Sequence, residues 1–290
     1  MSFIPKHTRF RGYQLVSRGA SFSYWDGENF TLGEARLTDE NVHSIIHELS
    51  ICGKDTIDTL YISSWEEDHC HPDELWEILT IYHPRTIYLP RVGPDPTNAG
   101  QVRSLKIIEE FKGPPEPQVY TTLNIPNAVP WAYCDVFCGL PESANSNDNS
   151  LPVLFHTGNI GVLSVGDLES AELSQLVSAM PMLNEQVDVY ILSHHGSSPS
   201  FNTRDLIQAI TPSVCIALVD RDNQYGHPDP VVQQRANDLS YYYSTKDGDV
   251  VIETAAESNH GNFKLFNYTK NGNKLDSIKE FTSKRMLRFS

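Results

Sequence analysis

Short hydrophobic runs of strand length recur along the chain, and stretches with helical periodicity separate most of them. The strand-like runs cover residues 13–16, 21–25, 59–63, 86–90, 132–137, 152–157, 161–166, 188–193, 214–219 and 249–254. The helix-like stretches lie around residues 39–50, 73–82, 101–111, 169–180, 203–210 and 229–239. Strands with interspersed helices favour sheets covered by helices, so the pattern predicts an α/β or α+β layered fold. A chain of 290 residues is long enough to bury the core that such a fold requires.

The charge of the chain is strongly negative and unevenly distributed. A net charge of −15 argues against a broad basic surface wrapped around nucleic acid. A local basic groove, or metal ions that neutralise substrate phosphates, would still be compatible with a nucleic-acid substrate. In residues 261–290, Lys and Arg outnumber Asp and Glu. We expect either a solvated final strand and helix there, or a contact with nucleic acid or an acidic protein partner.

Neither a membrane segment nor a disulfide framework is indicated by the sequence. No apolar run approaches the roughly 18 residues of a membrane helix, and the N-terminus, MSFIPKHTRFRGYQ, lacks the apolar centre of a signal peptide. We therefore predict a cytoplasmic protein without a membrane partner. The five cysteines follow no zinc-ribbon or disulfide spacing, and we interpret Cys134 and Cys138 as small buried side chains.

Carboxylates and imidazoles crowd the segment SSWEEDHCHP at residues 63–72, between a hydrophobic strand and the start of a helix. Similar groups follow three later strands: Asp167 after GVLSVG, His194 and His195 after DVYILS, and His227 beyond CIALV. Each taken alone has an ordinary interpretation, such as a helix cap for Asp167. Together, four strand exits could converge on one edge of a layered sheet. Asp and His ligands suit zinc, manganese or iron better than calcium or magnesium.

In this order, the segments SSWEEDHCHP, NSNDNSLPVLF, GVLSVGDLE, VDVYILSHHGSSPSFN and RDNQYGHPDP resemble those of metallo-β-lactamase-fold proteins. More narrowly, they resemble the hydrolase domain of the ComEC-type competence proteins and their free-standing relatives, over roughly residues 10–255. The resemblance implies a four-layer αββα sandwich with the site at one edge between two sheets. We predict one domain over residues 1–258, with a loop-rich excursion at 91–130, and a basic C-terminal extension at 259–290 packed on the same domain.

The resemblance also implies a set of metal ligands. The usual motif of the family is His-x-(His/Asp)-x-Asp-His; aligned on Asp68 and His69, this chain has Ser64 for the first histidine and Glu66 for the second ligand. Asp167 matches the acid that bridges two metals, and His227 matches the last histidine ligand. Because a serine hydroxyl is a weak ligand, we expect one firmly bound zinc or manganese ion and a second position that is weak or empty.

Further residues are carried over as catalytic or substrate-binding candidates. His194 matches a histidine that lies near the scissile phosphate in phosphodiesterase members, and Asp68 could position the attacking water. The remaining candidates for substrate binding are His195, Ser197, Asn149, Ser150 and Asn223. The family's Asp-x-Gly turn is replaced by Gly33-Glu34-Ala35, which is another departure.

The function that the resemblance implies is metal-dependent cleavage of phosphodiesters in DNA or RNA by a metal-activated water. Two alternatives stay open. The same fold could hydrolyse a small substrate such as a cyclic nucleotide, a β-lactam or a thioester, because fold alone does not fix chemistry. Alternatively, the chain could be a non-catalytic regulatory module with a degenerate metal site, for which Ser64 and the altered turn at Glu34 are the main support.

Overall fold

The computed structural model describes residues 7–111, 118–120, 140–254, 262–269 and 274–284. The strands are β1 (Arg9–Gly12), β2 (Phe22–Trp25), β3 (Phe30–Gly33), β4 (Thr59–Tyr61), β5 (Thr86–Tyr88), β6 (Gln118–Tyr120), β7 (Val153–Phe155), β8 (Val162–Ser164), β9 (Val189–Ile191), β10 (Val214–Ala217), β11 (Tyr241–Ser244), β12 (Val250–Thr254), β13 (Asn262–Thr269) and β14 (Lys274–Thr282). The helices are α1 (Val42–Ile51), α2 (Pro72–Tyr82), α3 (Ala99–Glu110), α4 (Ala171–Ser178), α5 (Pro181–Gln186), α6 (Arg204–Ile210) and α7 (Pro230–Leu239).

The described strands form two sheets. The first sheet has the order β14-β13-β12-β1-β2-β3-β4-β5-β6, and the second has the order β11-β10-β9-β8-β7. Within the first sheet β3, β4, β5 and β6 run parallel, and within the second sheet β8, β9, β10 and β11 run parallel. Helices connect these parallel strands, as the crossover from one parallel strand to the next requires. The carboxyl ends of each parallel set therefore meet at one edge of its sheet.

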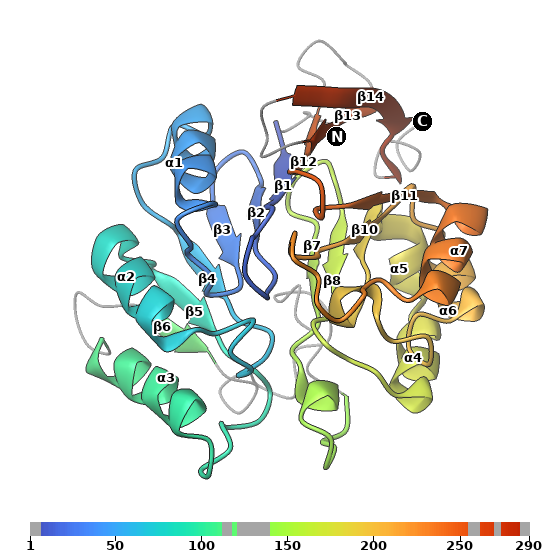
Figure 1. Cartoon of the computed structure of the whole chain (residues 1–290). Helices are drawn as coiled ribbons and strands as arrows, with labels where there is room; N and C mark the ends of the chain where they lie inside the picture. The colour runs from blue at the N-terminus through green and yellow to red at the C-terminus, as the bar shows by residue number, and fades with distance from the viewer. Residues whose placement is uncertain (1–6, 112–117, 121–139, 255–261, 270–273, 285–290) are drawn as a thin grey trace.

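The sheets and helices are stacked in four layers (Figure 1). Helices α1, α2 and α3 cover the outer face of the first sheet, and α4 to α7 cover the outer face of the second. Buried hydrophobic residues fall into three clusters, one between each sheet and its helices and one between the two sheets. The fold is thus the αββα arrangement that the sequence predicts, which confirms the predicted fold class.

Strand alternation explains how one strand supplies two of these cores. In β10, Val214 and Ile216 pack between the sheets, whereas Cys215 and Ala217 pack against the helices. All four residues of β10 are buried, which is expected for a parallel strand covered on both faces. A continuous hydrophobic run in the sequence is therefore the signature of such a strand.

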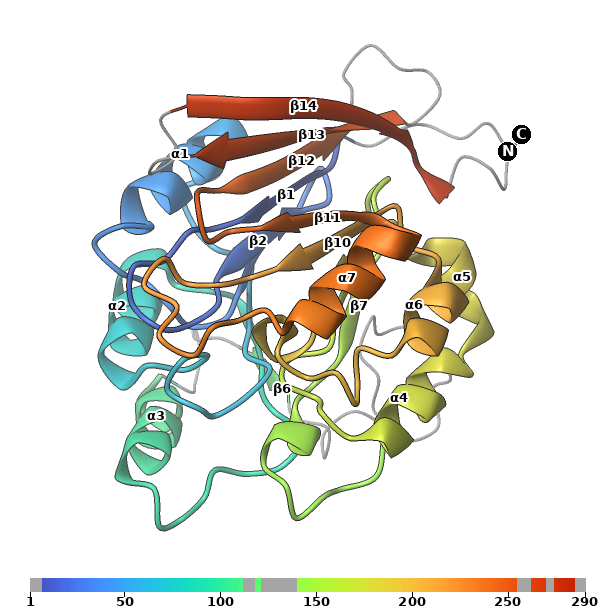
Figure 2. The ribbon, with the colours of Figure 1, turned by 45° about the vertical axis from the view of Figure 1, so that its right-hand side comes forward.

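Several predicted elements differ from the observed ones. Tyr13 and Leu15 are hydrophobic and buried, but residues 13–16 form a loop after β1 instead of a strand. The predicted strand at 132–137, with Cys134 and Cys138, lies outside the described residues, as do residues 112–117 and 121–130 of the excursion at 91–130. From the predicted C-terminal extension, β13 pairs with β12 and β14 pairs with β13, so these strands continue the first sheet (Figure 2). The domain boundary at residue 258 stays a prediction.

None of the helices in the described part of the chain combines the length and apolar character needed to cross a lipid bilayer.

Candidate metal centre

The candidate site lies where the parallel strands of the two sheets end. Asp68 and His69 follow β4 in the first sheet, whereas Asp167 follows β8 and His195 follows β9 in the second. Glu34 directly follows β3. Because loops at the carboxyl ends of parallel strands share one edge, residues distant in the sequence are brought together there.

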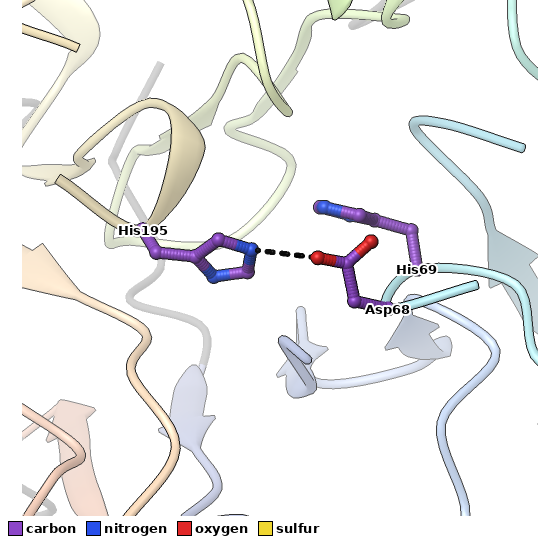
Figure 3. A group of neighbouring side chains, drawn as sticks. All are labelled: Asp68, His69 and His195. Atoms are coloured by element: carbon purple, nitrogen blue, oxygen red, sulfur yellow. Dashed lines mark ion pairs between the residues drawn. The ribbon is translucent and has the colours of Figure 1, made fainter. Parts of the chain in front are cut away.

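Three buried side chains, Asp68, His69 and His195, each offer one ligand atom within 4.8 Å of the others. In Figure 3 the imidazole of His195 points at the Asp68 carboxylate, and His69 stands beside that carboxylate on the same loop. His195 Nε2 lies 3.4 Å from Asp68 Oδ2. Side chains from the two sheets thus meet in one cluster, as they would around a metal ion.

Glu34 and Ser63 hold the ring of His69 at its Nδ1 edge, on the side away from Asp167. Its Nδ1 lies 3.2 Å from both the Glu34 carboxylate and the Ser63 hydroxyl, while Ser63 donates its backbone N–H and its hydroxyl to Glu34. These acceptors favour a proton on Nδ1, which leaves the lone pair on Nε2. His69 Nε2 lies 2.9 Å from Asp167 Oδ2 without the alignment of a hydrogen bond.

His195 is oriented in the same way. Its Nδ1 lies 2.8 Å from the Leu218 carbonyl oxygen, which can only accept, so the proton is on Nδ1 and Nε2 faces the cluster. A lone pair that faces a buried carboxylate is unfavourable unless a proton or a cation lies between the two. Burial alone would lower the pKa of His195, but the Asp68 and Asp167 carboxylates raise it above the ordinary value.

The pKa values of Asp68 and Asp167 are shifted in the opposite direction from that of His195. Burial by itself would raise the pKa of Asp68, but His195, His69 and Arg18 hold that pKa well below its ordinary range. Burial likewise opposes ionisation of Asp167, whose pKa is nevertheless lowered, chiefly by His69. Both carboxylates are therefore ionised at neutral pH and available as ligands.

Four buried atoms of the cluster lack a hydrogen-bond partner: Asp68 Oδ1, His69 Nε2, Asp167 Oδ1 and His195 Nε2. Buried polar atoms normally have a hydrogen-bond partner. Four buried atoms without one, brought together from the loops after different strands, are expected where an ion binds. Two imidazole nitrogens with fixed lone pairs and two carboxylates are the donors that zinc or manganese binds. The residues present fit a divalent transition metal.

The backbone that carries Asp167 requires a glycine before it. Gly166 has φ +59°, and a side chain there would collide with Ser63 and Ser150. The backbone N–H of Asp167 donates to Ser150 Oγ at 3.0 Å, so Ser150 positions this acid. Asn149, a predicted substrate-binding residue, exchanges hydrogen bonds with the backbone of Ser143 and orders the loop beside it.

The two adjacent histidines take different positions. The sequence predicts His194 near the reaction and His195 in substrate binding, whereas the structure places His195 in the buried cluster. His194 lies at the rim, 23% exposed, with Nδ1 3.3 Å from Glu169 Oε2 and its ring centroid 6.1 Å from that of His195. Ser197 and His194 line one cavity of about 470 Å³. Both histidines have a positive φ, so strand alternation does not determine where they point.

His227, predicted as a ligand, lies beside the cluster. Its ring is parallel to that of His195, with centroids 6.1 Å apart, and stacks on Tyr225 at 5.8 Å. Asn223 holds the backbone of His227 by accepting from its N–H and donating to its carbonyl oxygen. Burial, with His195 and His194 nearby, lowers the pKa of His227 and keeps it neutral, the form that binds a metal.

Ser64 and Glu66 make hydrogen bonds outside the cluster, unlike His69. Ser64 is buried, and its hydroxyl accepts from the Glu66 backbone N–H at 3.2 Å. The Glu66 carboxylate accepts from Gln101 on α3 at 3.2 Å. Ser64, Glu66 and Asn149 line a cavity of about 450 Å³. Glu66 is thus directed toward α3, outside the group formed by Asp68, His69 and His195.

Sequence reasoning misses Glu34, Ser63 and Arg18. Glu34 has a positive φ of 68°, unusual for a non-glycine residue, and the departure of the Gly33-Glu34-Ala35 turn from the family pattern is the signal that could have found it. Arg18, whose Nε donates to Asp68 Oδ2 at 2.7 Å, comes from a segment that carries no motif.

Sequence comparison finds a distant relative of the chain. No model of a known protein family matches the chain. Over 267 residues the chain is 25% identical to ComE operon protein 3 of Bacillus subtilis (strain 168), a match that covers 88% of this chain and 32% of that protein. The chain therefore spans less than half the length of this relative.

The structural comparison identifies the fold. The metallo-beta-lactamase fold protein YhfI from Bacillus subtilis superposes with a TM-score of 0.50 at 10% identity, covering 86% of this chain and 100% of YhfI. A diphosphatase of the PhnP family superposes with a TM-score of 0.42 at 12% identity, covering 84% of this chain and 97% of that chain. The layers, the sheets and this superposition define a protein of the metallo-β-lactamase fold. Within this fold the chain is related to ComE operon protein 3, which confirms the resemblance found in the sequence.

Proposed function

We propose that the protein is a metal-dependent hydrolase that cleaves phosphodiester bonds in DNA, RNA or nucleotides. The observation that carries the proposal is the convergence of unpartnered, buried donor atoms from Asp68, His69, Asp167 and His195. His69 Nε2 and His195 Nε2 are both directed into the space beside Asp68. The contacts of Glu34 with His69 and of the Leu218 carbonyl oxygen with His195 orient both rings toward the cluster, which favours a working site over a degenerate one.

The residues divide the tasks of hydrolysis among them. Asp68, His69, His195 and Asp167 would hold a divalent ion, which supplies Lewis-acid chemistry and lowers the pKa of water toward 7 when bound. His194 is partly exposed at the rim beside the cluster and could give a proton to the leaving group. Glu169, 3.3 Å from its Nδ1, would keep this imidazole oriented.

The substrate class is proposed from the resemblance of the sequence motifs to the hydrolase domain of the ComEC-type competence proteins. A bound divalent ion would neutralise the phosphates that the acids of the centre otherwise repel. The partner we propose is accordingly a nucleic acid or nucleotide. A small substrate is the second candidate, which the cavity of about 450 Å³ beside Ser64 favours, since small-molecule sites commonly have this size.

An activity panel tests the proposal. Protein purified without chelator and loaded with zinc or manganese is assayed on single-stranded DNA, double-stranded DNA, RNA, cyclic nucleotides, a β-lactam and a thioester. We expect phosphodiester cleavage that His69→Ala abolishes and that His47→Ala, at an exposed histidine of α1, leaves intact. Hydrolysis of the β-lactam or thioester alone would favour the second candidate, and inactivity of the metal-loaded protein on every substrate would reject both.

A further inference from the structure

Arg18 reaches the metal centre from the loop between β1 and β2. Its Nε lies 2.7 Å from Asp68 Oδ2, and its side chain is 50% exposed. Among the Lys and Arg side chains in the described part of the chain, that of Arg18 pairs with a carboxylate of the cluster. Its two terminal amino groups have no hydrogen-bond partner among the described residues. A guanidinium with one edge on a ligand and the other facing solvent is placed to meet an incoming anion.

The backbone at Arg18 is held by a buried ion pair. Arg36, on the segment after β3, donates to the Arg18 carbonyl oxygen and to Ser17 Oγ. Glu74 at the start of α2 holds the Arg36 guanidinium through two contacts of 2.8 and 3.2 Å. The loop is therefore anchored to the first sheet's helical layer, although the Arg18 side chain itself is half exposed.

Gly19 and Ala20 pack the loop between β1 and β2 against the loop that carries Asp68 and His69. Gly19 has φ +145°, and a Cβ there would lie 2.8 Å from the Asp68 carbonyl oxygen, a contact that only glycine permits. Ala20 donates its N–H to the same carbonyl oxygen at 3.1 Å. Arg18 is thus presented at a fixed position relative to Asp68.

On its other side the guanidinium of Arg18 lies over Tyr225, 5.2 Å from the ring centroid. Tyr225 is 57% exposed and stacks on His227, so Arg18, Tyr225 and His227 lie one after another beside the cluster. A cation held over an aromatic face keeps its charge at the mouth of the site while its N–H groups stay available.

The centre requires such a charge if its substrate is a phosphodiester. Asp68, Asp167 and Glu34 are buried acids around the site, and an anionic substrate would be repelled by them. On the other side, Ser64 and Glu66 are engaged with the backbone and with Gln101. A guanidinium, by contrast, matches a phosphate with two parallel N–H donors.

We propose that Arg18 is a catalytic residue that binds a non-bridging phosphoryl oxygen of the substrate through its terminal amino groups and supplies positive charge beside Asp68. The assignment rests on the proposed phosphodiesterase function. On substrate binding the guanidinium keeps or exchanges its contact with Asp68 while its terminal amino groups engage the phosphate. No covalent step involves Arg18.

Binding of inorganic phosphate to the zinc-loaded protein, measured by calorimetry, tests this role without requiring turnover. Arg18→Gln should weaken phosphate binding by about 10- to 100-fold, the effect of losing hydrogen bonds to a charged group. Arg18→Lys should recover part of the affinity, since it restores the charge without the planar fork. The matched control is Arg204→Gln, a 52% exposed arginine paired with Asp238 on α7, which should bind phosphate as the wild type does. Circular dichroism and zinc stoichiometry establish that each variant is folded and loaded.

The outcomes separate this assignment from the proposed function. If the wild type cleaves phosphodiesters but Arg18→Gln keeps the wild-type phosphate affinity and KM, the role of Arg18 is overturned and the function stands. Absence of phosphate binding to zinc-loaded wild type also overturns it. Phosphate binding that depends on Arg18, in a protein that cleaves none of the phosphodiesters, supports the anion site while the proposed function fails.

Discussion

The contact between Glu34 and His69 should determine how tightly the centre binds metal. The change is Glu34→Gln, which keeps the shape of the side chain and removes its charge. In the wild type the carboxylate accepts from Ser63 N at 2.9 Å and from Ser63 Oγ at 2.6 Å, and lies 3.2 Å from His69 Nδ1. The amide retains one acceptor oxygen and turns an NH₂ group toward one of these donors.

From these contacts we expect two effects of Glu34→Gln. Loss of the carboxylate that contacts His69 Nδ1 weakens metal binding by about 10- to 100-fold, because His69 becomes less basic and less firmly oriented. A hydrogen bond to a buried charged group contributes about 1.5–3 kcal/mol, so the free energy of unfolding of the metal-free protein should fall by a similar amount. Zinc affinity is measured by competition with a chromogenic chelator, and stability by urea unfolding without metal.

A matched control separates the two effects. Glu48→Gln alters a carboxylate that is also buried, 1% exposed, but paired with Arg9 instead of a cluster residue. It should lower the free energy of unfolding while leaving zinc affinity unchanged. The reasoning is refuted if Glu34→Gln lowers stability yet binds zinc as tightly as the wild type, because Glu34 would then only support the fold.

Two further predictions concern the metal centre, and a third concerns a buried acid elsewhere in the fold. Asp167→Ala should remove metal and activity together, whereas His194→Ala should keep its metal and lose about 10²–10⁴-fold in turnover, as metal analysis and initial rates will show. Ser64→His should raise metal stoichiometry or affinity at the second position; unchanged values on dialysis would mean that the backbone there cannot present a ligand. Burial raises the pKa of Asp188 to about 6. Because the folded state then binds its proton more tightly than the unfolded state, Asp188 should lower stability progressively from pH 4 to 6, a slope that urea unfolding of Asp188→Asn should lack.

The fold and the edge that carries the site could be predicted because the relevant signals are local. A buried parallel strand is a continuous hydrophobic run, and the polar residue that follows it lies at the sheet edge whichever strand carries it. Asp68, His69 and Asp167 are therefore recognisable from the sequence. The run at 13–16 shows the limit of this signal, since Tyr13 and Leu15 are buried in a loop without a partner strand.

The remaining parts of the site depend on tertiary geometry. His194 and His195 are adjacent and chemically identical, and both have a left-handed backbone, with φ of 50° and 55°. Their side-chain directions follow from that turn and from the Leu218 carbonyl, which the residue type does not encode. Glu34 reaches the cluster from the turn after β3, and Arg18 from the loop between β1 and β2. Both are distant from Asp68 in the sequence, so only the assembled fold reveals them.

Anomalous diffraction from crystals grown or soaked with zinc or manganese tests the central claim most directly, because it locates the ion without reference to any substrate. We predict a peak among Asp68, His69 and His195, with Asp167 as an adjoining ligand, that disappears in His69→Ala crystals treated identically. The absence of a peak at this cluster in the wild type, after soaking in millimolar metal, would contradict the assignment of the protein as a metal-dependent hydrolase.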